Sequence, residues 1–485
     1  MEEDDIRYRA LCANDPRFDG LFFVGIKTTG IYCRSLCPAR RAHQKNCTFY
    51  NTAAAAEGSG YRPCLRCRPE LAPSCSPYEQ QFNKAAALIA QIQGGALNGE
   101  KRLTDLATRH GLSVRQLRRI VKGAAGVTPV QLAQTSRLLL AKQLLTESEL
   151  PVTEIAFASG FASLRRFNEL FAASYSMPPS RFRRVPRRAS SIRPGGALEL
   201  RLAYRPPLAW DALLAFLKPR AIPGVESVES GIYRRTLQIG EGRGTLDVSL
   251  DAPANQLRVQ ISSGLTPVLQ VLLARVRDLF DLHSRPSLVD EHLARSKHLS
   301  ALVKRCPGLR VPGTMDSFEL AWRAVLGQQV SVVGASTLAG RFAKRFGEPF
   351  EEPRGALTGF TPRPEEVART SVREIAAIGI PLKRAQSLQA LAGLCCDEPE
   401  LLAPGSPADR VRENLQTLPG IGPWTAEYVV MRALRWPDAF PASDLGIKRA
   451  LKRESPNECL ELAKDWSPWR SYAALHLWTS LSDKD

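Results

Sequence analysis

Residues 415–434 have the sequence LQTLPGIGPWTAEYVVMRAL, in which Leu-Pro-Gly-Ile-Gly separates two segments with helical patterns. Gly420 and Gly422 allow a tight turn, and they let the first backbone N–H groups of the second helix point at a phosphate. Two helices joined in this way would hold DNA without reading its base sequence. A Pro-Gly-Ile-Gly turn is common by itself, so its meaning depends on the residues C-terminal to it.

About twenty residues later, Asp444 precedes an amphipathic helix in DAFPASDLGIKRAL. A single Asp at a helix start is usually an N-cap. A glycine hairpin followed at this distance by such an Asp, however, resembles the helix-hairpin-helix DNA glycosylase superfamily. The resemblance is closest to the AlkA family of 3-methyladenine DNA glycosylases and covers nearly all of residues 196–485, including PGLRVPGTMDSFELAWRAVLGQQVSV, GIPLKRAQSL and WSPWRSYAALHLW.

The resemblance implies an enzyme that flips an alkylated nucleotide out of the duplex. Asp444 would stabilise the oxocarbenium sugar and help a water molecule to attack it. Trp424, Tyr428 and Trp478 match the family's aromatic positions, where they would stack on a cationic base. Each of these rings, judged alone, is more typical of a hydrophobic core.

Position 424 also bears on mechanism, because bifunctional relatives carry a Schiff-base lysine there. With Trp at this position we expect base excision without strand cleavage. Gln329 replaces an apolar wedge residue and Leu445 replaces an aromatic one, so the range of lesions stays open.

Further DNA and ion contacts are implied by the same family. Gln328, Gln329, Gly420 and Gly422 are expected to contact DNA. A monovalent cation is expected at the hairpin, held by the backbone carbonyls of Gln416, Leu418 and Ile421.

Two close pairs of cysteines lie near the N-terminus: Cys33-x3-Cys37 and, after 26 intervening residues, Cys64-x2-Cys67. Two such pairs supply the ligands of a tetrahedral zinc site. The chain has eleven cysteines and no signal-peptide pattern, which fits a reducing compartment and a metal site rather than disulfides. Spacing alone favours a structural zinc site.

The surrounding run, FFVGIKTTGIYCRSLCPARRAHQKNCTFY followed by GYRPCLRCRPE, resembles the N-terminal domain of the Ada family over about fifty residues. That resemblance implies one zinc ion per chain and assigns Cys33 as the acceptor of a methyl group from a DNA methylphosphotriester. Arg34, Arg40 and Arg62 match positions near the phosphate.

Methyl transfer to Cys33 would work as a switch. A zinc ion with four thiolates carries a formal charge of −2 and repels DNA phosphates, and conversion of one thiolate to a thioether halves that charge. The thioether has no easy way back, so we expect one methyl group per protein molecule.

Two helix-turn-helix patterns lie between these two regions. In the first, RLTDLATRHGLSVRQLRRIVKGAAG, we expect a helix over 103–110, a turn at Gly111 and a Ser113-capped helix bearing Arg115 and Arg118. The second, LPVTEIAFASGFASLRRFNELFAASYSMPPSRFR, turns at Gly160 and bears Arg165 and Arg166. A long helix near 131–145 separates them. A small helical bundle with a basic face is the alternative, but the paired endings resemble the AraC family, which implies promoter recognition.

The net charge of +18 points to a polyanionic partner. Lys and Arg outnumber Asp and Glu by 29 to 15 in residues 1–194 but only by 37 to 33 in residues 195–485. No run is long and apolar enough to span a membrane, and the start is acidic. Together with the family resemblances, we expect a monomer in the bacterial cytoplasm, associated with the nucleoid, whose partners are alkylated DNA, promoter DNA and RNA polymerase.

These patterns predict a multidomain α+β protein, with strands alternating with helices after residue 196 and only helices beyond Val311. The expected segments are a zinc-binding acceptor domain (1–78), an AraC-type double helix-turn-helix (79–184), a basic linker (185–195), an AlkA-type α+β domain (196–311) and an all-α glycosylase domain (312–485). The Pro-Cys-His-Arg motif of a second Ada acceptor domain is absent. Two alternatives stay open: a regulator with structural zinc and an inactive glycosylase-like half, and a glycosylase that its N-terminal half only tethers to DNA.

Overall fold

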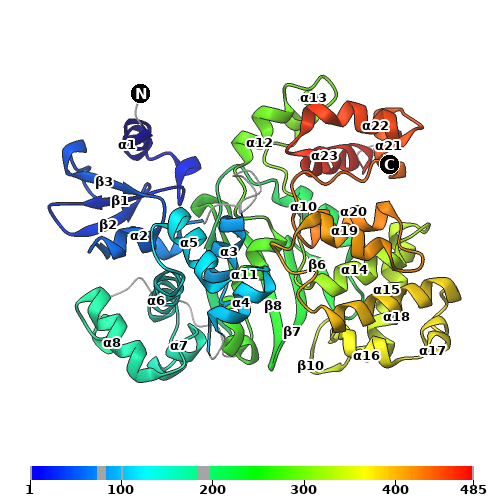
Figure 1. The fold of residues 1–485 in the computed structure, drawn as a ribbon, viewed down its shortest axis with the longest axis horizontal. Helices are drawn as coiled ribbons and strands as arrows, with labels where there is room; N and C mark the ends of the chain where they lie inside the picture. The colour runs from blue at the N-terminus through cyan, green and yellow to red at the C-terminus, as the bar shows by residue number, and fades with distance from the viewer. Residues whose placement is uncertain (1–2, 74–83, 100–101, 184–196, 483–485) are drawn as a thin grey trace. The chain divides into compact units, whose positions relative to one another are not determined.

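The computed structural model describes residues 3–73, 84–99, 102–183 and 197–482 (Figure 1). They form two compact units: the first comprises 1–206, 251–274 and 282–284, and the second comprises 207–250, 275–281 and 285–485. The predicted basic linker lies outside the described residues. Within the described ranges, no helix has the length and apolarity needed to cross a membrane.

The first unit begins with a small four-stranded sheet in the order β3-β1-β2-β4. β1 pairs antiparallel with β2 and β3, whereas β4 runs parallel to β2. Phe22 and Val24 pack with the four clustered cysteines in its core. The elements here are α1 (Glu3–Ala13), β1 (Phe23–Ile26), β2 (Ile31–Arg34), β3 (Cys47–Tyr50), α2 (Ala53–Gly58) and β4 (Arg62–Pro63).

The helix-turn-helix region matches the predicted pattern closely. Gly111 and Gly160 have positive φ angles of 61° and 90° at the two turns. The Ser113 hydroxyl accepts a hydrogen bond from the Gln116 N–H at 3.2 Å and caps the second helix of the first pair. The helices are α3 (Lys84–Gln93), α4 (Leu103–Arg109), α5 (Val114–Ala125), α6 (Pro129–Glu147), α7 (Val152–Ala158), α8 (Leu164–Tyr175) and α9 (Pro179–Arg183).

The long helix α6 is joined to the cysteine-containing segment by buried polar contacts. The Lys142 ammonium, whose residue is 1% exposed, donates to the carbonyl of Cys64 at 2.8 Å and to the Glu70 carboxylate at 2.6 Å. The Thr135 hydroxyl donates to the Glu57 carboxylate at 2.5 Å. A charge buried in this way needs its partner to remain stable.

The first unit also holds two antiparallel strands, β5 (Leu198–Ala203) and β9 (Gln256–Ile261), in register from Leu198 opposite Ile261. In the second unit β6 (Glu226–Glu229), β7 (Ile232–Ile239) and β8 (Gly242–Asp251) form an antiparallel meander. The alternation seen in the sequence located β5, β8 and β9, but not β6 and β7.

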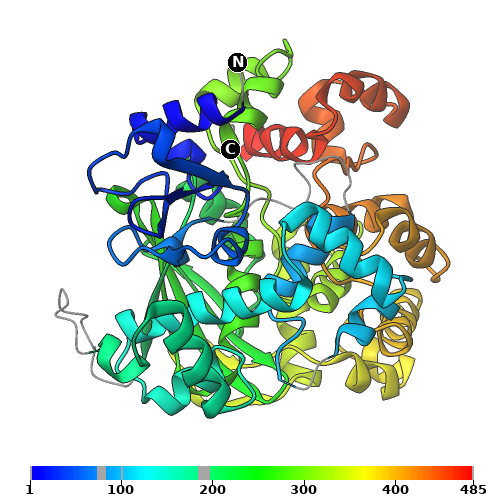
Figure 2. The same cartoon turned by 60° about the vertical axis from the view of Figure 1, so that its left-hand side comes forward.

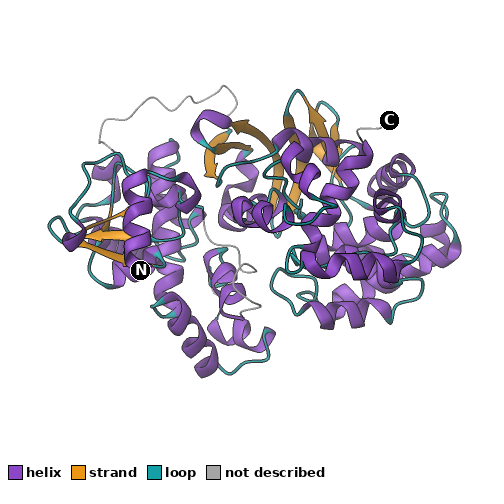
Figure 3. Ribbon diagram, turned by 90° about the horizontal axis from the view of Figure 1, so that it is seen from above, coloured by secondary structure: helices purple, strands orange, loops and turns teal. Residues whose placement is uncertain are grey.

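Helices predominate in the rest of the second unit (Figure 3). Trp322 and Phe342 lie in its large apolar core. The red C-terminal helices α21, α22 and α23 lie together in Figures 1 and 2. The remaining helices are α10 (Trp210–Leu217), α11 (Leu269–Leu279), α12 (Pro286–Leu293), α13 (Ser300–Arg305), α14 (Ser317–Leu326), α15 (Val332–Phe346), α16 (Pro364–Arg369), α17 (Val372–Ala376), α18 (Leu382–Asp397), α19 (Ala408–Gln416), α20 (Pro423–Arg432), α21 (Leu445–Leu451), α22 (Pro456–Ala463) and α23 (Arg470–Ser482).

The expectation of helices alone beyond Val311 is wrong at one place. β10 (Pro349–Arg354) and β11 (Leu357–Gly359) form an antiparallel hairpin. Pro353 disfavours a helix interior, and Gly355 with a φ of +61° closes the turn.

Candidate metal centre and base pocket

The four predicted zinc ligands meet in one cluster. Because β2 and β4 run parallel, with Ile31 opposite Arg62, they bring the two cysteine pairs together. The four sulfur atoms lie within 4.8 Å of one another and all four residues are buried. Cys33, Cys37, Cys64 and Cys67 are thus placed so that they could hold one metal ion.

The donor set fits a divalent thiophilic metal. Without a metal, hydrogen bonding to Cys37 and the other neighbouring thiols, together with burial, raises the pKa of Cys33. The hydrogen bond from Cys33 helps to lower the pKa of Cys37 to about 7. Four crowded sulfurs therefore cannot all ionise by themselves, whereas a zinc ion would compensate their charge.

The four sulfurs differ in their hydrogen bonds. The backbone N–H of Arg66 donates to the Cys64 sulfur at 3.4 Å, and that of Arg34 donates to the Cys67 sulfur at 3.5 Å. The hydrogen bond from Cys33 lowers the pKa of Cys37 most, and a hydrogen bond from the Ala39 backbone N–H lowers it by a smaller amount. In the described part of the chain, the Cys33 sulfur receives no backbone N–H donor, which distinguishes it from the other three.

A cavity of about 320 Å³ opens beside this cluster. Its wall combines apolar side chains, among them Val24 and Ile31, with three of the cysteines and four arginines. The arginines are Arg40, Arg41, Arg62 and Arg66, of which only Arg40 and Arg62 were predicted.

The expectation that Arg34 lies at the phosphate is not met. Its guanidinium is buried in an ion pair with Asp19, with its Nε donating to Asp19 Oδ1 at 2.7 Å. Arg41 and Arg66 take its place at the cavity. Their closeness in sequence to Cys37 and Cys64 was the signal that could have identified them.

The predicted recognition arginines are exposed. On α5, Arg115 and Arg118 face outward while Leu117 is buried. On α8, Arg165 and Arg166 are also exposed, and both pair with Glu169, at 3.0 and 3.6 Å.

In the second unit, the glycine hairpin joins α19 to α20. Gly420 has a φ of +74°, and a Cβ there would lie 2.6 Å from the Ser387 hydroxyl. The Gln328 side-chain amide donates to the Gly420 carbonyl and the Thr425 hydroxyl, both at 2.9 Å. Gln328 thus braces the hairpin, whereas the adjacent Gln329 is exposed.

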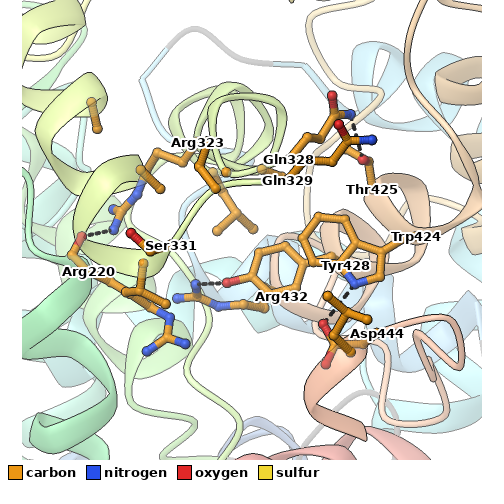
Figure 4. A pocket seen from close by; sticks show the side chains of 18 of the residues that line it. Arg220, Arg323, Gln328, Gln329, Ser331, Trp424, Thr425, Tyr428, Arg432 and Asp444 are labelled. Atoms are coloured by element: carbon orange, nitrogen blue, oxygen red, sulfur yellow. Dashed lines mark hydrogen bonds between the residues drawn. The ribbon is translucent and has the colours of Figure 1, made fainter. Parts of the chain in front are cut away.

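The Asp444 carboxylate is held by three donors. Oδ1 accepts from the Trp478 indole N–H at 2.8 Å and from the Ile447 backbone N–H at 3.0 Å. Oδ2 accepts from the Trp424 indole N–H at 3.0 Å (Figure 4). Asp444 therefore both caps α21 and points into the pocket.

A pocket of about 1030 Å³ contains Asp444 and the three predicted aromatic residues. The Trp424 and Tyr428 rings stack, with centroids 5.4 Å apart and planes inclined by 12°. The centroid of the Trp478 ring lies 6.2 Å from that of the Tyr428 ring. The rings form the walls that a flat base would contact. Gln328, Gln329, Gly420 and Gly422 line the same pocket.

The sequence did not point to the arginines of this pocket: Arg220, Arg323 and Arg432. Arg432 lies four residues after Tyr428, which lies four after Trp424, so all three occupy one face of α20. That spacing could have identified Arg432. Arg220, far away in sequence, gave no such signal.

Known families match almost the whole chain. The metal-binding domain of Ada matches residues 6–70 and a helix-turn-helix domain matches 106–185. The AlkA N-terminal domain matches 199–316, and the HhH-GPD superfamily of base excision DNA repair proteins matches 322–458. The folds and sites thus define a protein that joins an Ada-type regulator to an AlkA-type DNA glycosylase fold.

One relative has the same architecture. The "Probable bifunctional transcriptional activator/DNA repair enzyme AlkA" of Mycobacterium tuberculosis is 38% identical over 99% of this chain and 97% of its own length. The chain belongs to the family of bifunctional transcriptional activator/DNA repair enzymes that this protein represents.

Two Escherichia coli proteins each match one half. DNA-3-methyladenine glycosylase 2 is 37% identical over 57% of this chain and 95% of its own length. The bifunctional transcriptional activator/DNA repair enzyme Ada is 32% identical over 37% of this chain and 49% of its own length. The structure of a 3-methyladenine DNA glycosylase from Archaeoglobus fulgidus shares the fold over 59% of this chain and 98% of its own, with a TM-score of 0.52 and 23% identity.

Proposed function

We propose that this protein repairs alkylated DNA in two ways and regulates genes in response. It transfers methyl groups from phosphotriesters to Cys33, and it hydrolyses the glycosidic bond of alkylated bases such as 3-methyladenine. The observation that carries the proposal is the Asp444 carboxylate, held by two indole N–H groups inside an aromatic pocket.

In base excision, Asp444 stabilises the positive charge that develops on the sugar and orients the attacking water. Trp424, Tyr428 and Trp478 stack on the flipped base. The C1′–N bond breaks, and the base leaves with the bonding electron pair. Since position 424 is not a lysine, the DNA strand stays intact.

The decisive measurement is release of 3-methyladenine from alkylated DNA. We expect wild type to release it and Asp444→Asn to be at least 100-fold slower, because a neutral amide cannot stabilise the sugar cation. Asn is as good an N-cap as Asp, so the variant keeps α21. No release by wild type would leave the alternative of a regulator with an inactive glycosylase-like half.

In methyl transfer, a bound zinc ion would keep the four sulfurs deprotonated at neutral pH. The Cys33 sulfur attacks the methyl carbon of the phosphotriester, a C–S bond forms, and the C–O bond breaks with its electron pair on the departing phosphodiester. Arg40, Arg41, Arg62 and Arg66 hold the phosphate. The lack of an N–H donor to the Cys33 sulfur supports its role as acceptor.

Incubation with DNA that carries labelled methylphosphotriesters tests this step. Wild type should retain one label per molecule, on the peptide containing Cys33. Cys33→Ala should retain none, and Cys47→Ala, outside the cluster, should behave as wild type. Label on another cysteine of the wild-type protein would contradict the assignment.

Methylation of Cys33 would remove one negative charge from the cluster and so strengthen binding to phosphates. Arg115, Arg118, Arg165 and Arg166 would then contact the promoter. Affinity for that promoter should rise on methylation; unchanged affinity would leave the alternative of a tethered glycosylase. The proposal further includes a monomer, contact with RNA polymerase, association with the nucleoid and a monovalent cation at the carbonyls of the hairpin.

A further inference from the structure

The Asp19 side chain is linked to the cysteine cluster through Arg34. Asp19 is 2% exposed, and its Oδ1 accepts a hydrogen bond from Arg34 Nε at 2.7 Å. Arg34 directly follows Cys33, and its backbone N–H donates to the Cys67 sulfur at 3.5 Å. Asp19 therefore fixes a residue that is bonded to one of the clustered cysteines and hydrogen-bonded to another.

The backbone of Asp19 is held in turn by Arg205. The Arg205 guanidinium donates through Nε to the Asp19 carbonyl at 3.0 Å and through Nη2 to the Pro73 carbonyl at 3.1 Å. Its Nη1 donates to the His283 carbonyl at 2.7 Å. Arg205 is 1% exposed, so these carbonyls replace the water that a guanidinium would otherwise bind.

These residues come from two family regions of the chain but from one compact unit. Arg205 lies just after β5, and both Arg205 and His283 fall within the AlkA N-terminal match at residues 199–316. Asp19 falls within the match to the metal-binding domain of Ada, at residues 6–70. All of them belong to the first unit. A side chain of the AlkA-type segment thus supports the Ada-type segment beside its cysteine cluster.

The chain next to Asp19 has little freedom to move. Gly20 has a φ of +71°, and a Cβ at this position would lie 1.8 Å from the Pro73 carbonyl oxygen. Arg205 donates to that same oxygen and to the Asp19 carbonyl, so one guanidinium holds both chain segments where they cross. Loss of this guanidinium would therefore release the backbone that carries the Asp19 carboxylate.

We propose that Arg205 is a positioning residue for the metal centre: through Asp19 it fixes Arg34, and so it holds the four cysteines in the geometry that retains zinc. This inference rests on the proposed acceptor function, in which a zinc ion occupies the cluster. Groups that orient metal ligands alter metal affinity although they do not touch the metal. The acceptor centre thus depends on the AlkA-type segment and is not merely linked to it.

The rate of zinc release from the full chain tests this inference. The zinc-loaded protein is mixed with an excess of a chelator that changes colour when it binds zinc. Arg205→Met should accelerate release about tenfold, because loss of a group that orients metal ligands weakens metal binding by about tenfold to a hundredfold. Arg205→Lys keeps the charge but has a single donor nitrogen, so it should act in the same direction with a smaller effect. It replaces Arg205→Met in the test if that variant does not fold.

Gln270→Leu is the matched control, since Gln270 also joins the AlkA-type segment to the regulator half. It is 7% exposed, its amide donates to the Gln93 carbonyl at 2.6 Å, and its Oε1 accepts from the Asn98 amide at 2.8 Å. These contacts reach the helix-turn-helix segment and not Asp19. Gln270→Leu should lower the stability of the first unit and leave zinc release within about twofold of the wild-type rate. Equal acceleration by this variant and Arg205→Met would show that only docking of the segments matters, and would overturn the inference.

A double-mutant cycle tests the path through Arg34. Arg34→Met should also accelerate zinc release, and adding Arg205→Met to it should change the rate by less than about twofold, because both residues act through Asp19. Single effects that multiply in the double variant would overturn the inference, as would wild-type release from both Arg205 variants. A wild-type protein that binds no zinc would refute the metal centre and the inference with it. One that binds zinc but takes up no methyl label would refute the methyl transfer alone.

Discussion

Gln329 lies at the mouth of the base pocket with a backbone φ of +55°. Side chains are disfavoured in this left-handed region, and strain of this kind recurs at functional sites. Gln329 is exposed and lines this pocket, where the proposed function has its side chain fill the gap that a flipped base leaves.

The Gln329→Gly variant tests the backbone strain at this position separately from the role of the side chain in base release. Glycine adopts the same angle without cost, so we expect the free energy of unfolding to stay equal or rise by up to about 1 kcal/mol. Base release should become slower, because nothing then fills the gap in the duplex. Denaturant unfolding and single-turnover release measure the two effects. A loss of stability greater than about 1 kcal/mol would contradict a strained backbone.

His476 makes stability depend on pH. It is 2% exposed on α23, and burial, with a smaller effect of Arg305, lowers its pKa to about 4. Between pH 6.5 and 4 the unfolded chain binds this proton and the folded chain does not, so stability falls as the pH falls, by about 3 kcal/mol in total. His476→Leu should remove that part of the dependence. If the free energy of unfolding depended on pH in the same way in His476→Leu as in wild type, this contribution of His476 would be disproved.

At the scale of elements, the hairpin between α19 and α20 has one glycine that is required and one that is not. Gly420 has a positive φ and no room for a Cβ beside Ser387, whereas a Cβ at Gly422 would meet no atom within 4 Å. The hairpin could be predicted from the sequence, but the difference between the two glycines could not. It depends on the contact of Gly420 with Ser387 of α18, which lies in a distant part of the chain.

Gly420→Ala should therefore cost about 1–3 kcal/mol of stability and weaken binding to undamaged DNA, because the hairpin must shift. Gly422→Ala is the matched control and should change stability by less than about 0.5 kcal/mol. Thermal unfolding and DNA titration compare them. Equal effects would mean that the turn tolerates a side chain at both positions.

Local signals predicted most elements. Caps and turn glycines located the helix-turn-helix units, where Ser113, Gly111 and Gly160 act as expected. β7 escaped prediction because YRRTLQ interrupts the alternation of apolar and polar residues, and β6 escaped it because its four residues, ESVE, include only one apolar side chain. In the base pocket the aromatic residues were predicted, but the direction of their N–H groups was not, because it depends on how α20 and α23 pack.

At the scale of the whole molecule, not every basic side chain of the N-terminal half is available to DNA. Lys142 and Arg34 are buried in ion pairs with Glu70 and Asp19. Composition counts such residues with the exposed ones, so it overstates the basic surface. Which basic side chains are exposed could not be predicted, since pairing joins residues far apart in the chain, such as Lys142 and Glu70 at a separation of 72 positions.

Lys142→Met should destabilise the first unit by about 1–3 kcal/mol, because the buried Glu70 carboxylate would lose one of its two cationic partners and keep only Arg68, at 3.1 Å. Lys122→Met, at an exposed position of α5, serves as control and should have little effect. Differential scanning calorimetry of the full chain measures the thermal unfolding transition of each unit. Base release by the folded protein should not change. A loss below about 1 kcal/mol would mean that Arg68 alone compensates the Glu70 charge.

The repeat of Trp424, Tyr428 and Arg432 along α20 has a practical consequence for redesign. One helix face carries two stacked rings and a guanidinium that donates to the hydroxyl oxygen of the second ring. Under the proposed function, a library confined to these three codons would sample changes in lesion preference without altering the glycine hairpin itself. Directed evolution toward new damaged bases can therefore begin with three positions on one face of α20.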